Sequence, residues 1–266
     1  GADIVLSLPS VGATENAILA ACGAEGTSVI YNAAREPEIV DLQALLRSMG
    51  ARVNGAGGSI ITVEGGAALH GCTHRVIGDR IVCATYLCAA AAAGGEVRLT
   101  GVDYRAVSTV ALSLAESGCE VRSEADAVSL RSTRALRSVR PVRTAPYPGF
   151  PTDAQPVLMA ALLRSEGCTV FVENIFENRY RHVDELSRMG AEIRVAGRVA
   201  VVNGVRTLHG AAVKCTDLRG GAALVIAGLS AEGTTRVTEL THIDRGYDAI
   251  ERDLAALGAQ IRRETT

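Results

Sequence analysis

The hydrophobic positions of the chain follow two different helical patterns, and the first is amphipathic. Residues 36–49 carry apolar side chains at helical spacing, and Gly50 follows directly. A glycine at this point supplies the left-handed conformation that ends a helix and turns the chain into a strand. The pattern therefore predicts a helix with one buried face. The apolar positions are Ile39, Leu42, Leu45, Leu46 and Met49.

The second pattern is apolar on every side of the helix. It occurs in "NAILAACGA" (16–24), "IVCATYLCAAAAA" (81–93), "PVLMAALL" (156–163) and "ALVIAGLSA" (223–231). A helix without a polar face is typical of a position buried on all sides. We therefore expect four such helices to lie inside the fold.

Both patterns belong to one unit that is repeated four times. The segments "LRSMGARV", "LAESGCEV", "LSRMGAEI" and "LAALGAQI" share a helix end, a glycine and a strand-like continuation, and their glycines recur at about 70-residue intervals. A second landmark keeps the same phase in "EGTSVI", "GGEVRL", "EGCTVF" and "EGTTRV". The repeat predicts an α/β (α+β) fold built from β-α-β-α-β-β units with buried helices.

Composition and charge exclude several classes of protein. The formal net charge of −2 gives no basic surplus for nucleic acid, and the apolar stretches are too short to cross a bilayer. We therefore expect a soluble protein that binds neither nucleic acid nor membrane. The seven cysteines are scattered without a CxxC pair, which indicates reduced, mostly buried thiols in a cytoplasm.

One short segment has the residue types of a metal site. In "HGCTH" (70–74), His70, Cys72 and His74 alternate, and on a strand they would share one face. A zinc site needs a fourth ligand and usually wider spacing. We expect ordinary strand-edge residues and no metal.

The start of each buried helix carries a small or acidic residue of the kind that caps helices. These starts are "PSVGAT", "GDRI", "PTDA" and "TDLR". For Asp153 two interpretations stay open. Thr152 and Gln155 could form a capping box, with Asp153 as a cap and Pro156 in the first turn. Alternatively, the prolines of "TAPYPGFPTDAQP" (144–156) hold Asp153 rigidly as a catalytic base.

An arginine stands where each outer helix is expected to begin. A cation there opposes the helix dipole, so four of them favour an anionic ligand such as phosphate or carboxylate. For any single arginine a solvated surface role remains open. The arginines are Arg35, Arg105, Arg179 and Arg245, with Arg80 and Arg219 at the buried-helix starts.

Long motifs resemble the UDP-N-acetylglucosamine 1-carboxyvinyltransferase family of enolpyruvyl transferases. They include "NAAREPEIVDLQALLRSMGA", "VRTAPYPGFPTDAQ", "FENRYRHVDELSRMGA" and "HIDRGYDAIERDLAALGA", and the resemblance runs along the whole chain. It implies an inside-out α/β barrel fold with three units in each of two domains. Residues 1–77 would be the last unit of the first domain and residues 78–266 the second domain. Four of six units are present, so we expect that an N-terminal portion is missing.

The resemblance also implies a reaction. The enolpyruvyl group of phosphoenolpyruvate passes to the 3-hydroxyl of UDP-N-acetylglucosamine and phosphate is released, without a metal or organic cofactor. This is the first committed step of peptidoglycan synthesis. It would place the protein in the cytoplasm and in cell wall biogenesis, cell shape, cell division and the cell cycle.

The same resemblance implies roles for particular residues. Asp153 would take the proton of the 3-hydroxyl, and Arg245 would act with it at the reacting group. Ile175 would contact the sugar amide through its backbone. The other implied contacts are Ser10, Val11 and Gly12 to the diphosphate, Arg179 and Arg219 to phosphoenolpyruvate, and Arg80 and Asp217 nearby.

The chain also departs from the family. Leu8 stands where some relatives have lysine, and the family's glycine-rich loop with its acid has no counterpart. A transfer that lacks its acid should lose orders of magnitude in rate, so we expect the chain alone to be inactive. Two alternatives remain: a catalytically silent sugar-nucleotide-binding module, or an enzyme like 3-phosphoshikimate 1-carboxyvinyltransferase. The motifs "AAREPE" and "HIDRGYD" favour the nucleotide-sugar branch. We also expect the first unit to expose apolar surface.

Overall fold

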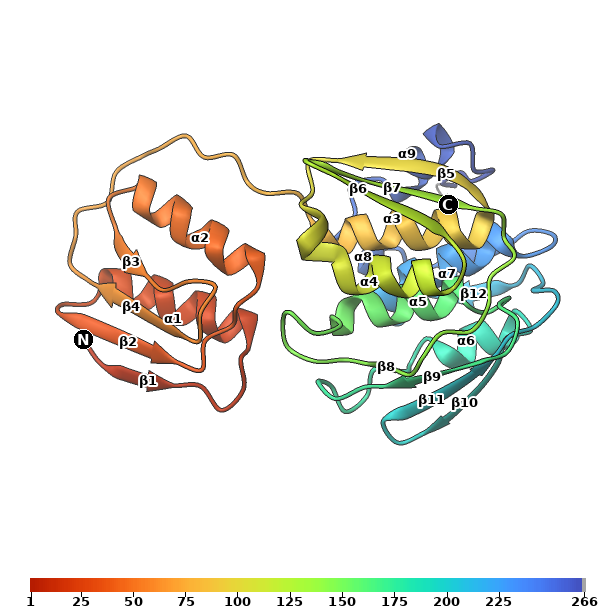
Figure 1. Cartoon of the computed structure of the whole chain (residues 1–266), viewed down its shortest axis with the longest axis horizontal. Helices are drawn as coiled ribbons and strands as arrows, with labels where there is room; N and C mark the ends of the chain where they lie inside the picture. Colours follow the sequence, from red (N-terminus) through yellow and green to blue (C-terminus); the bar gives the residue numbers. More distant parts are fainter. Residues whose placement is uncertain (265–266) are drawn as a thin grey trace. The chain divides into compact units, whose positions relative to one another are not determined.

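The computed structural model describes residues 1–264, which form two compact units (Figure 1). The first unit comprises Gly1–Ile77 together with Pro146–Gly149, and the second comprises Gly78–Ala145 and Phe150–Thr266. Each unit has its own hydrophobic core. They are described separately below.

The first unit contains one complete copy of the predicted repeat. Its elements are β1 (Asp3–Val5), α1 (Val11–Gly23), β2 (Thr27–Tyr31), α2 (Pro37–Ser48), β3 (Arg52–Asn54) and β4 (Ile60–Glu64). The sheet order is β1-β2-β4-β3, with β1 parallel to β2 and the other pairs antiparallel. The amphipathic helix α2 buries Ile39, Gln43 and Leu46, which confirms the face predicted for it.

The second unit contains the other three copies. The second copy is α3 (Arg80–Ala93), β5 (Gly95–Thr100), α4 (Tyr104–Glu116), β6 (Glu120–Glu124) and β7 (Ala127–Ser132). The third is β8 (Val142–Arg143), a 3₁₀ turn (Thr152–Ala154), α5 (Gln155–Ala161), β9 (Cys168–Val172), α6 (Val183–Arg188), β10 (Glu192–Ala196) and β11 (Val199–Asn203). The fourth is β12 (Ala212–Lys214), α7 (Leu218–Ser230), β13 (Arg236–Thr238), α8 (Thr241–Asp244) and α9 (Ile250–Ala256).

Strand pairing shows that the first and third copies share one topology. The third copy has the order β8-β9-β11-β10, with the same parallel and antiparallel pairs as the first unit. The second copy lacks the first strand of the predicted unit, and the fourth lacks the last two among residues 1–264. The prediction of β-α-β-α-β-β in every copy is therefore wrong for these two. A strand forms only where a neighbouring strand supplies hydrogen-bond partners. In the fourth copy, the segment after α9 has no such neighbour in the part of the chain that the structure describes, and its Arg263 side chain forms ion pairs with Asp244 and Glu251.

The all-apolar helices behave differently in the two units. In the second unit α3, α5 and α7 pack on one another, and every residue of α5 is buried (Figure 1). This confirms the prediction for three helices. For α1 the prediction is wrong, because only Thr14, Ile18, Ala21 and Cys22 are buried and Leu19 is 50% exposed. The first unit holds a single helix of this kind, so no second one covers its outer face.

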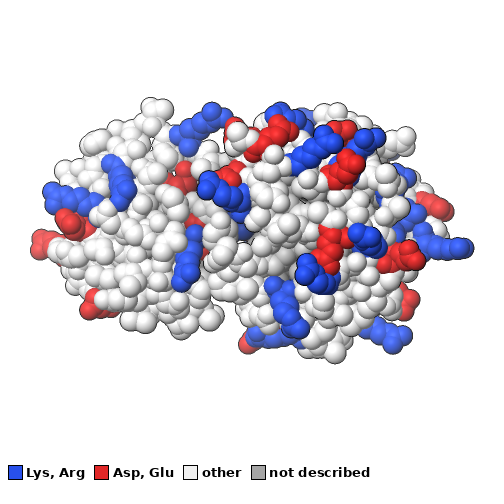
Figure 2. All heavy atoms as spheres, viewed as in Figure 1, with Lys and Arg blue, Asp and Glu red and all other residues white. Residues whose placement is uncertain are grey.

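The surface and the thiols agree with the composition. On the face shown in Figure 2, basic and acidic side chains are interspersed without a continuous basic area. Within the described residues no helix is long and apolar enough to span a bilayer. All seven cysteines are free thiols, and only Cys72 and Cys168 are exposed, which confirms that they are mostly buried.

Candidate functional site

One carboxylate and two arginines form a cluster at the start of α5 in the second unit. The Nη2 atom of Arg179 lies 2.7 Å from Oδ1 of Asp153, and the Nε atom of Arg219 lies 3.2 Å from Oδ2. The arginine side chains are 16% and 10% exposed, whereas that of Asp153 is 39% exposed. The cluster thus presents its carboxylate to solvent and keeps its cations largely buried.

The local backbone explains how Asp153 reaches these arginines. Asp153 lies in the 3₁₀ turn Thr152–Ala154, and Pro156 occupies the first turn of α5. Neither the turn nor α5 has a side-chain cap, because the Thr152 hydroxyl donates to Oε2 of Glu173 at 3.0 Å. The capping-box interpretation is therefore wrong. The Asp153 carboxylate is free to accept charge-assisted hydrogen bonds, which are about twice as strong as neutral ones.

Both guanidinium groups keep a buried N–H that has no partner. Within residues 1–264, Nε of Arg179 and Nη1 of Arg219 make no hydrogen bond. Arg219 packs 5.3 Å from the centre of the Tyr247 ring, and Arg179 packs 5.4 Å from that of Phe176. Burial opposes the charge of Arg219, but Tyr247 and Asp153 outweigh it and raise the pKa of the guanidinium. A buried donor without an acceptor is costly, so these groups are suited to bind an anion.

Asp217 fixes the helix turn that carries Arg219. Its Oδ1 atom accepts hydrogen bonds from the backbone N–H groups of Arg219 at 3.1 Å and Gly220 at 2.8 Å. The predicted N-cap of α7 is therefore confirmed. The caps predicted in "PSVGAT" and "GDRI" are confirmed as well, with Ser10 capping α1 and Asp79 capping α3.

His182 lies beside this cluster and was missed by the sequence analysis. It is fully buried, and neither ring nitrogen has a hydrogen-bond partner among the described residues. The pKa of His182 is lowered to about 4, chiefly by burial; Asp217 opposes the shift, and the charge of Arg179 acts in the same direction as burial. In "RYRHVDEL" the histidine stands among charged residues without periodicity, so no signal in the sequence marks it as buried.

The other arginines do not all lie where the sequence predicted. Arg105 is in the first turn of α4 and forms an exposed pair with Asp103 at 2.6 Å, which is the surface role left open. Arg245 follows α8 and is exposed, five residues before α9 begins. Its predicted place at an outer-helix start is wrong, because Ala249 takes a left-handed conformation (φ 53°) before α9. Arg80 is the first residue of α3 and is half-buried.

In the first unit, the predicted nucleotide contacts lie at the start of α1. Ser10 caps the helix by accepting from the N–H of Ala13 at 3.4 Å. Val11 and Gly12 form its first turn, where backbone N–H groups have no partner inside the helix. A Cβ atom added to Gly12 would have no atom within 4 Å, so the space beside this turn is open. Leu8 is 68% exposed nearby in the sequence.

Ile175 has only one backbone group free for a ligand. Its N–H donates to Oε1 of Glu173 at 2.9 Å. Its carbonyl accepts no hydrogen bond from any residue that the structure describes. A carbonyl accepts from an amide N–H, so the contact predicted for this backbone is chemically possible through the oxygen.

The histidine and cysteine segment does not form the predicted strand. Residues 65–79 contain no strand, because they have no ladder partner. His74 instead pairs with Asp41 at 2.9 Å, and Nδ1 of His70 lies 3.1 Å from the Gly71 carbonyl oxygen. In residues 1–264 no group of three metal-ligating side chains comes together.

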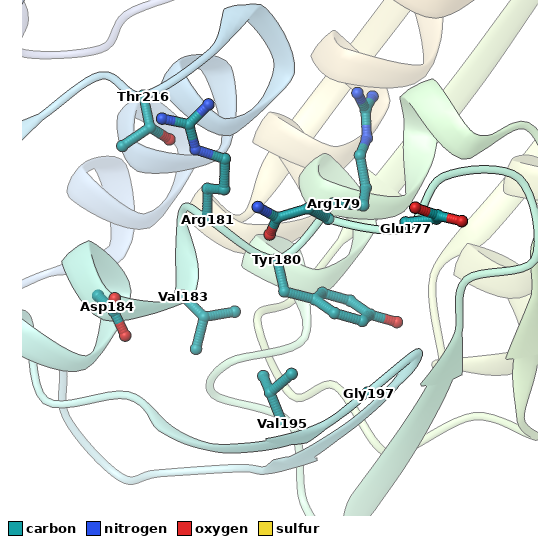
Figure 3. Close-up of a pocket in the computed structure, with 10 residues that line it drawn as sticks. Glu177, Arg179, Tyr180, Arg181, Val183, Asp184, Val195, Gly197 and Thr216 are labelled. Carbon is teal, nitrogen blue, oxygen red and sulfur yellow. The ribbon is translucent and has the colours of Figure 1, made fainter.

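A hollow of about 440 Å³ lies beside the segment that carries Arg179. Tyr180, Val183 and Val195 line its apolar part, whereas the Arg179 side chain points away from Val183 and Val195 (Figure 3). Arg179 lines the hollow, but Asp153 is not among its lining residues.

Comparison with known proteins identifies relatives along nearly the whole chain. The chain is 52% identical over 263 residues to the UDP-N-acetylglucosamine 1-carboxyvinyltransferase of Gluconacetobacter diazotrophicus, and covers 99% of itself and 62% of that protein. It is also 52% identical to UDP-N-acetylglucosamine 1-carboxyvinyltransferase 1 of Symbiobacterium thermophilum, covering 59% of it. The chain thus spans about three-fifths of the length of these relatives.

Solved structures share the fold. The crystal structure of the enolpyruvyl transferase NikO from Streptomyces tendae matches with a TM-score of 0.86 and 29% identity, over 98% of this chain and 65% of that one. An EPSP synthase from Acinetobacter baumannii matches with a TM-score of 0.76 and 20% identity, over 99% of this chain and 63% of that one, which supports the fold alone. The family model of EPSP synthase (3-phosphoshikimate 1-carboxyvinyltransferase) matches residues 1–254. These matches confirm the resemblance carried by the sequence motifs, and the chain belongs to the EPSP synthase family of carboxyvinyl transferases.

Proposed function

We propose that this chain is part of an enzyme that transfers the enolpyruvyl group of phosphoenolpyruvate to the 3-hydroxyl of UDP-N-acetylglucosamine. The observation that carries the proposal is the Asp153 carboxylate held by Arg179 and Arg219, each with an unpartnered buried N–H. The names of the relatives at 52% identity support the choice of acceptor.

In this reaction Asp153 is the base. It takes the proton of the sugar 3-hydroxyl while the oxygen attacks C2 of phosphoenolpyruvate and an acid from the rest of the complete enzyme protonates C3. The tetrahedral adduct then loses a proton from C3 together with phosphate, which restores the carbon–carbon double bond of the transferred group. The free N–H groups of Arg179 and Arg219 bind the anionic groups of phosphoenolpyruvate. Arg245 and Arg80 are further contacts to the same substrate, and Asp217 holds the turn that carries Arg219.

The sugar nucleotide occupies two backbone sites. Ser10, Val11 and Gly12 bind its diphosphate at the start of α1, where free N–H groups and the helix dipole favour an anion. The carbonyl of Ile175 accepts a hydrogen bond from the N–H of the sugar amide. The open space beside Gly12 supports this approach to the backbone.

The complete fold is proposed to contain six repeat units in two domains, arranged as an inside-out α/β barrel. Residues 1–77 are then the last unit of the first domain, and residues 78–266 are the second. The exposed apolar face of α1 and the chain's coverage of about three-fifths of its relatives support this arrangement. The enzyme would act in the cytoplasm, in peptidoglycan synthesis and cell wall biogenesis.

Substitution of the base tests the proposal in the complete enzyme that contains this chain. Asp153→Asn keeps the shape of the side chain but removes the proton acceptor, so turnover should fall by about 100-fold or more. Phosphate release with both substrates is the measurement. The matched control is Asp126→Asn at an exposed carboxylate, which should leave turnover unchanged. Near-normal turnover of Asp153→Asn would refute the base role.

A second candidate is a sugar-nucleotide-binding module without turnover, which the partial coverage of the relatives keeps open. The intact mass of the expressed gene product distinguishes the two. A longer product supports the enzyme, and a product of this length supports the module. In both cases UDP-N-acetylglucosamine should protect the chain against heating, since a ligand of the folded state raises stability. Protection by shikimate 3-phosphate instead would favour the sister enzyme.

A further inference from the structure

Glu173 is a buried carboxylate with an unusual set of partners. It lies directly after β9, is 1% exposed, and forms no ion pair with any described residue. Its two oxygens accept four hydrogen bonds. These come from the hydroxyls of Thr144 (2.9 Å) and Thr152 (3.0 Å) and the backbone N–H groups of Ile175 (2.9 Å) and Phe176 (3.0 Å).

The hydrogen-bond directions in this network are fixed by its donors. The Thr144 hydroxyl accepts from the N–H of Asn174 at 2.8 Å, so its own proton is directed to Glu173. Oε1 receives three donors and Oε2 receives one. A carboxylate can accept all of them. The amide oxygen of a glutamine could still accept the three donors at Oε1, so only a side chain without acceptors, such as leucine, removes these hydrogen bonds. Burying a carboxylate is costly, and these four hydrogen bonds offset that cost.

The partners of Glu173 belong to the two parts of the candidate site that the sugar would contact. Thr152 immediately precedes Asp153 in the 3₁₀ turn, so its bond to Oε2 fixes the start of the segment that carries the base. The bonds from Ile175 and Phe176 to Oε1 use both N–H groups and leave the Ile175 carbonyl free. One carboxylate therefore sets the base and the sugar-amide contact at a constant separation.

We propose that Glu173 is a positioning residue for the transfer reaction, acting through Thr152 on Asp153 and through the 175–176 backbone on the sugar amide. This inference rests on the proposed function. Glu173 is buried among these partners and takes no proton from the substrate. Its contribution is geometric, and a displacement of about 1 Å at a reacting group can cost up to about 100-fold in rate.

The two links can be tested separately, the first with Thr152→Val and Thr152→Ser in the complete enzyme and the second with Glu173→Leu. Thr152→Val removes one hydroxyl and keeps the shape, so kcat should fall by about tenfold or more while KM for UDP-N-acetylglucosamine changes by less than about twofold. Thr152→Ser restores the hydroxyl and should restore kcat. The matched control is Thr235→Val, because the buried Thr235 hydroxyl has no partner within the described residues.

Hydrogen exchange in the ligand-free chain tests the second link without turnover. Glu173→Leu removes both acceptor oxygens, so it should speed exchange of the Ile175 and Phe176 amides by about tenfold, while the β9 amides exchange as in the wild type. Unchanged exchange at these two amides would show that Glu173 does not hold them. If Glu173→Leu does not fold, Thr152→Val still decides the link to the base.

The outcomes separate this inference from the proposed function. A wild-type enzyme that does not turn over these substrates refutes the proposed function. An active wild type with a Thr152→Val variant as fast as Thr235→Val refutes only the positioning role. A Thr152→Val variant that loses heat stability but keeps kcat would show that the network is merely structural.

Discussion

At the scale of single residues, Arg179 and Arg219 each have a hydrogen-bond donor that is not used within the described part of the chain. Each is largely buried, pairs with Asp153 and retains an N–H without an acceptor in the described part of the chain. Leaving such a donor unpaired costs about 1–3 kcal/mol, which a bound anion would recover. His182 lies three residues after Arg179 in the sequence. Both of its ring nitrogens are buried without hydrogen-bond partners among the described residues.

Acid should therefore destabilise the protein through His182. Its pKa is lowered from 6.5 to about 4, so the unfolded chain takes up the proton first and the stability contribution is lost as pH falls through this window. The free energy of unfolding of the wild type should fall between pH 7 and pH 5. In His182→Leu this fall should be smaller by about 2 kcal/mol. Urea unfolding followed by circular dichroism at both pH values measures it.

The control for this prediction is His209→Leu, since His209 is exposed. Its pH dependence of stability should match that of the wild type. An equal pH dependence in His182→Leu and the wild type would mean that the buried ring does not take part in acid unfolding.

The helices α1 and α7 occupy corresponding places in the repeat, and each has a glycine near its start, but the surroundings of the two glycines differ. In α7, a Cβ on Gly221 would lie 2.7 Å from Cγ1 of Ile243 and 2.8 Å from the Cys215 sulfur, so the glycine allows close packing. In α1, a Cβ on Gly12 meets nothing within 4 Å. Packing within the first unit does not require a glycine there, and we attribute it to the approach of a ligand.

Gly12→Ala should therefore stabilise the ligand-free chain and weaken its binding of the nucleotide. Alanine is favoured over glycine in a helix by up to about 1 kcal/mol. The added methyl group occupies the space where the diphosphate would reach the backbone, so protection against heating by UDP-N-acetylglucosamine should decrease. Thermal unfolding with and without the nucleotide measures both effects.

Gly221→Ala provides the contrast, because overpacking there should destabilise the second unit by about 1–3 kcal/mol. If Gly12→Ala left nucleotide protection unchanged, the diphosphate would have to bind elsewhere.

At the scale of the whole molecule, the all-apolar helices are covered by one another in the second unit, whereas the one in the first unit keeps an exposed face. The helices α3, α5 and α7 cover one another, whereas α1 has an apolar outer face that includes Leu19. An exposed apolar face of this kind favours association.

We expect the chain to self-associate with increasing concentration through the outer face of α1. Leu19→Lys places a charge on this face and should shift the chain toward the monomer in sedimentation velocity across a dilution series. The matched control is Leu112→Lys on α4, where Leu112 is 60% exposed, and it should leave association unchanged. A wild-type chain that stays monomeric at high concentration would contradict the expectation.

The candidate site was only partly predictable from the sequence. Asp153, Arg179 and Arg219 were named from the motifs that carry the family resemblance, and the structure brings all three together. Glu173 and His182 were missed. Glu173 directly follows the apolar strand β9 and His182 stands among charged residues, and in neither place does the sequence pattern mark the side chain as buried. Their environment depends on partners that lie far along the chain.

The amino-acid sequence by itself determined the complete order of elements in the first and third copies, the amphipathic face of α2 and the caps at Ser10, Asp79 and Asp217, since these depend on local hydrogen bonds and on side-chain periodicity.

Only the tertiary structure decided that Asp153 pairs with arginines 26 and 66 residues away instead of capping α5. It also decided that α1 keeps an exposed face and that residues 65–79 form no strand. The physical reason is the same in each case. Charge-assisted bonds between distant groups outweigh a local cap, and a helix face or a strand is completed only by a partner that local sequence does not contain.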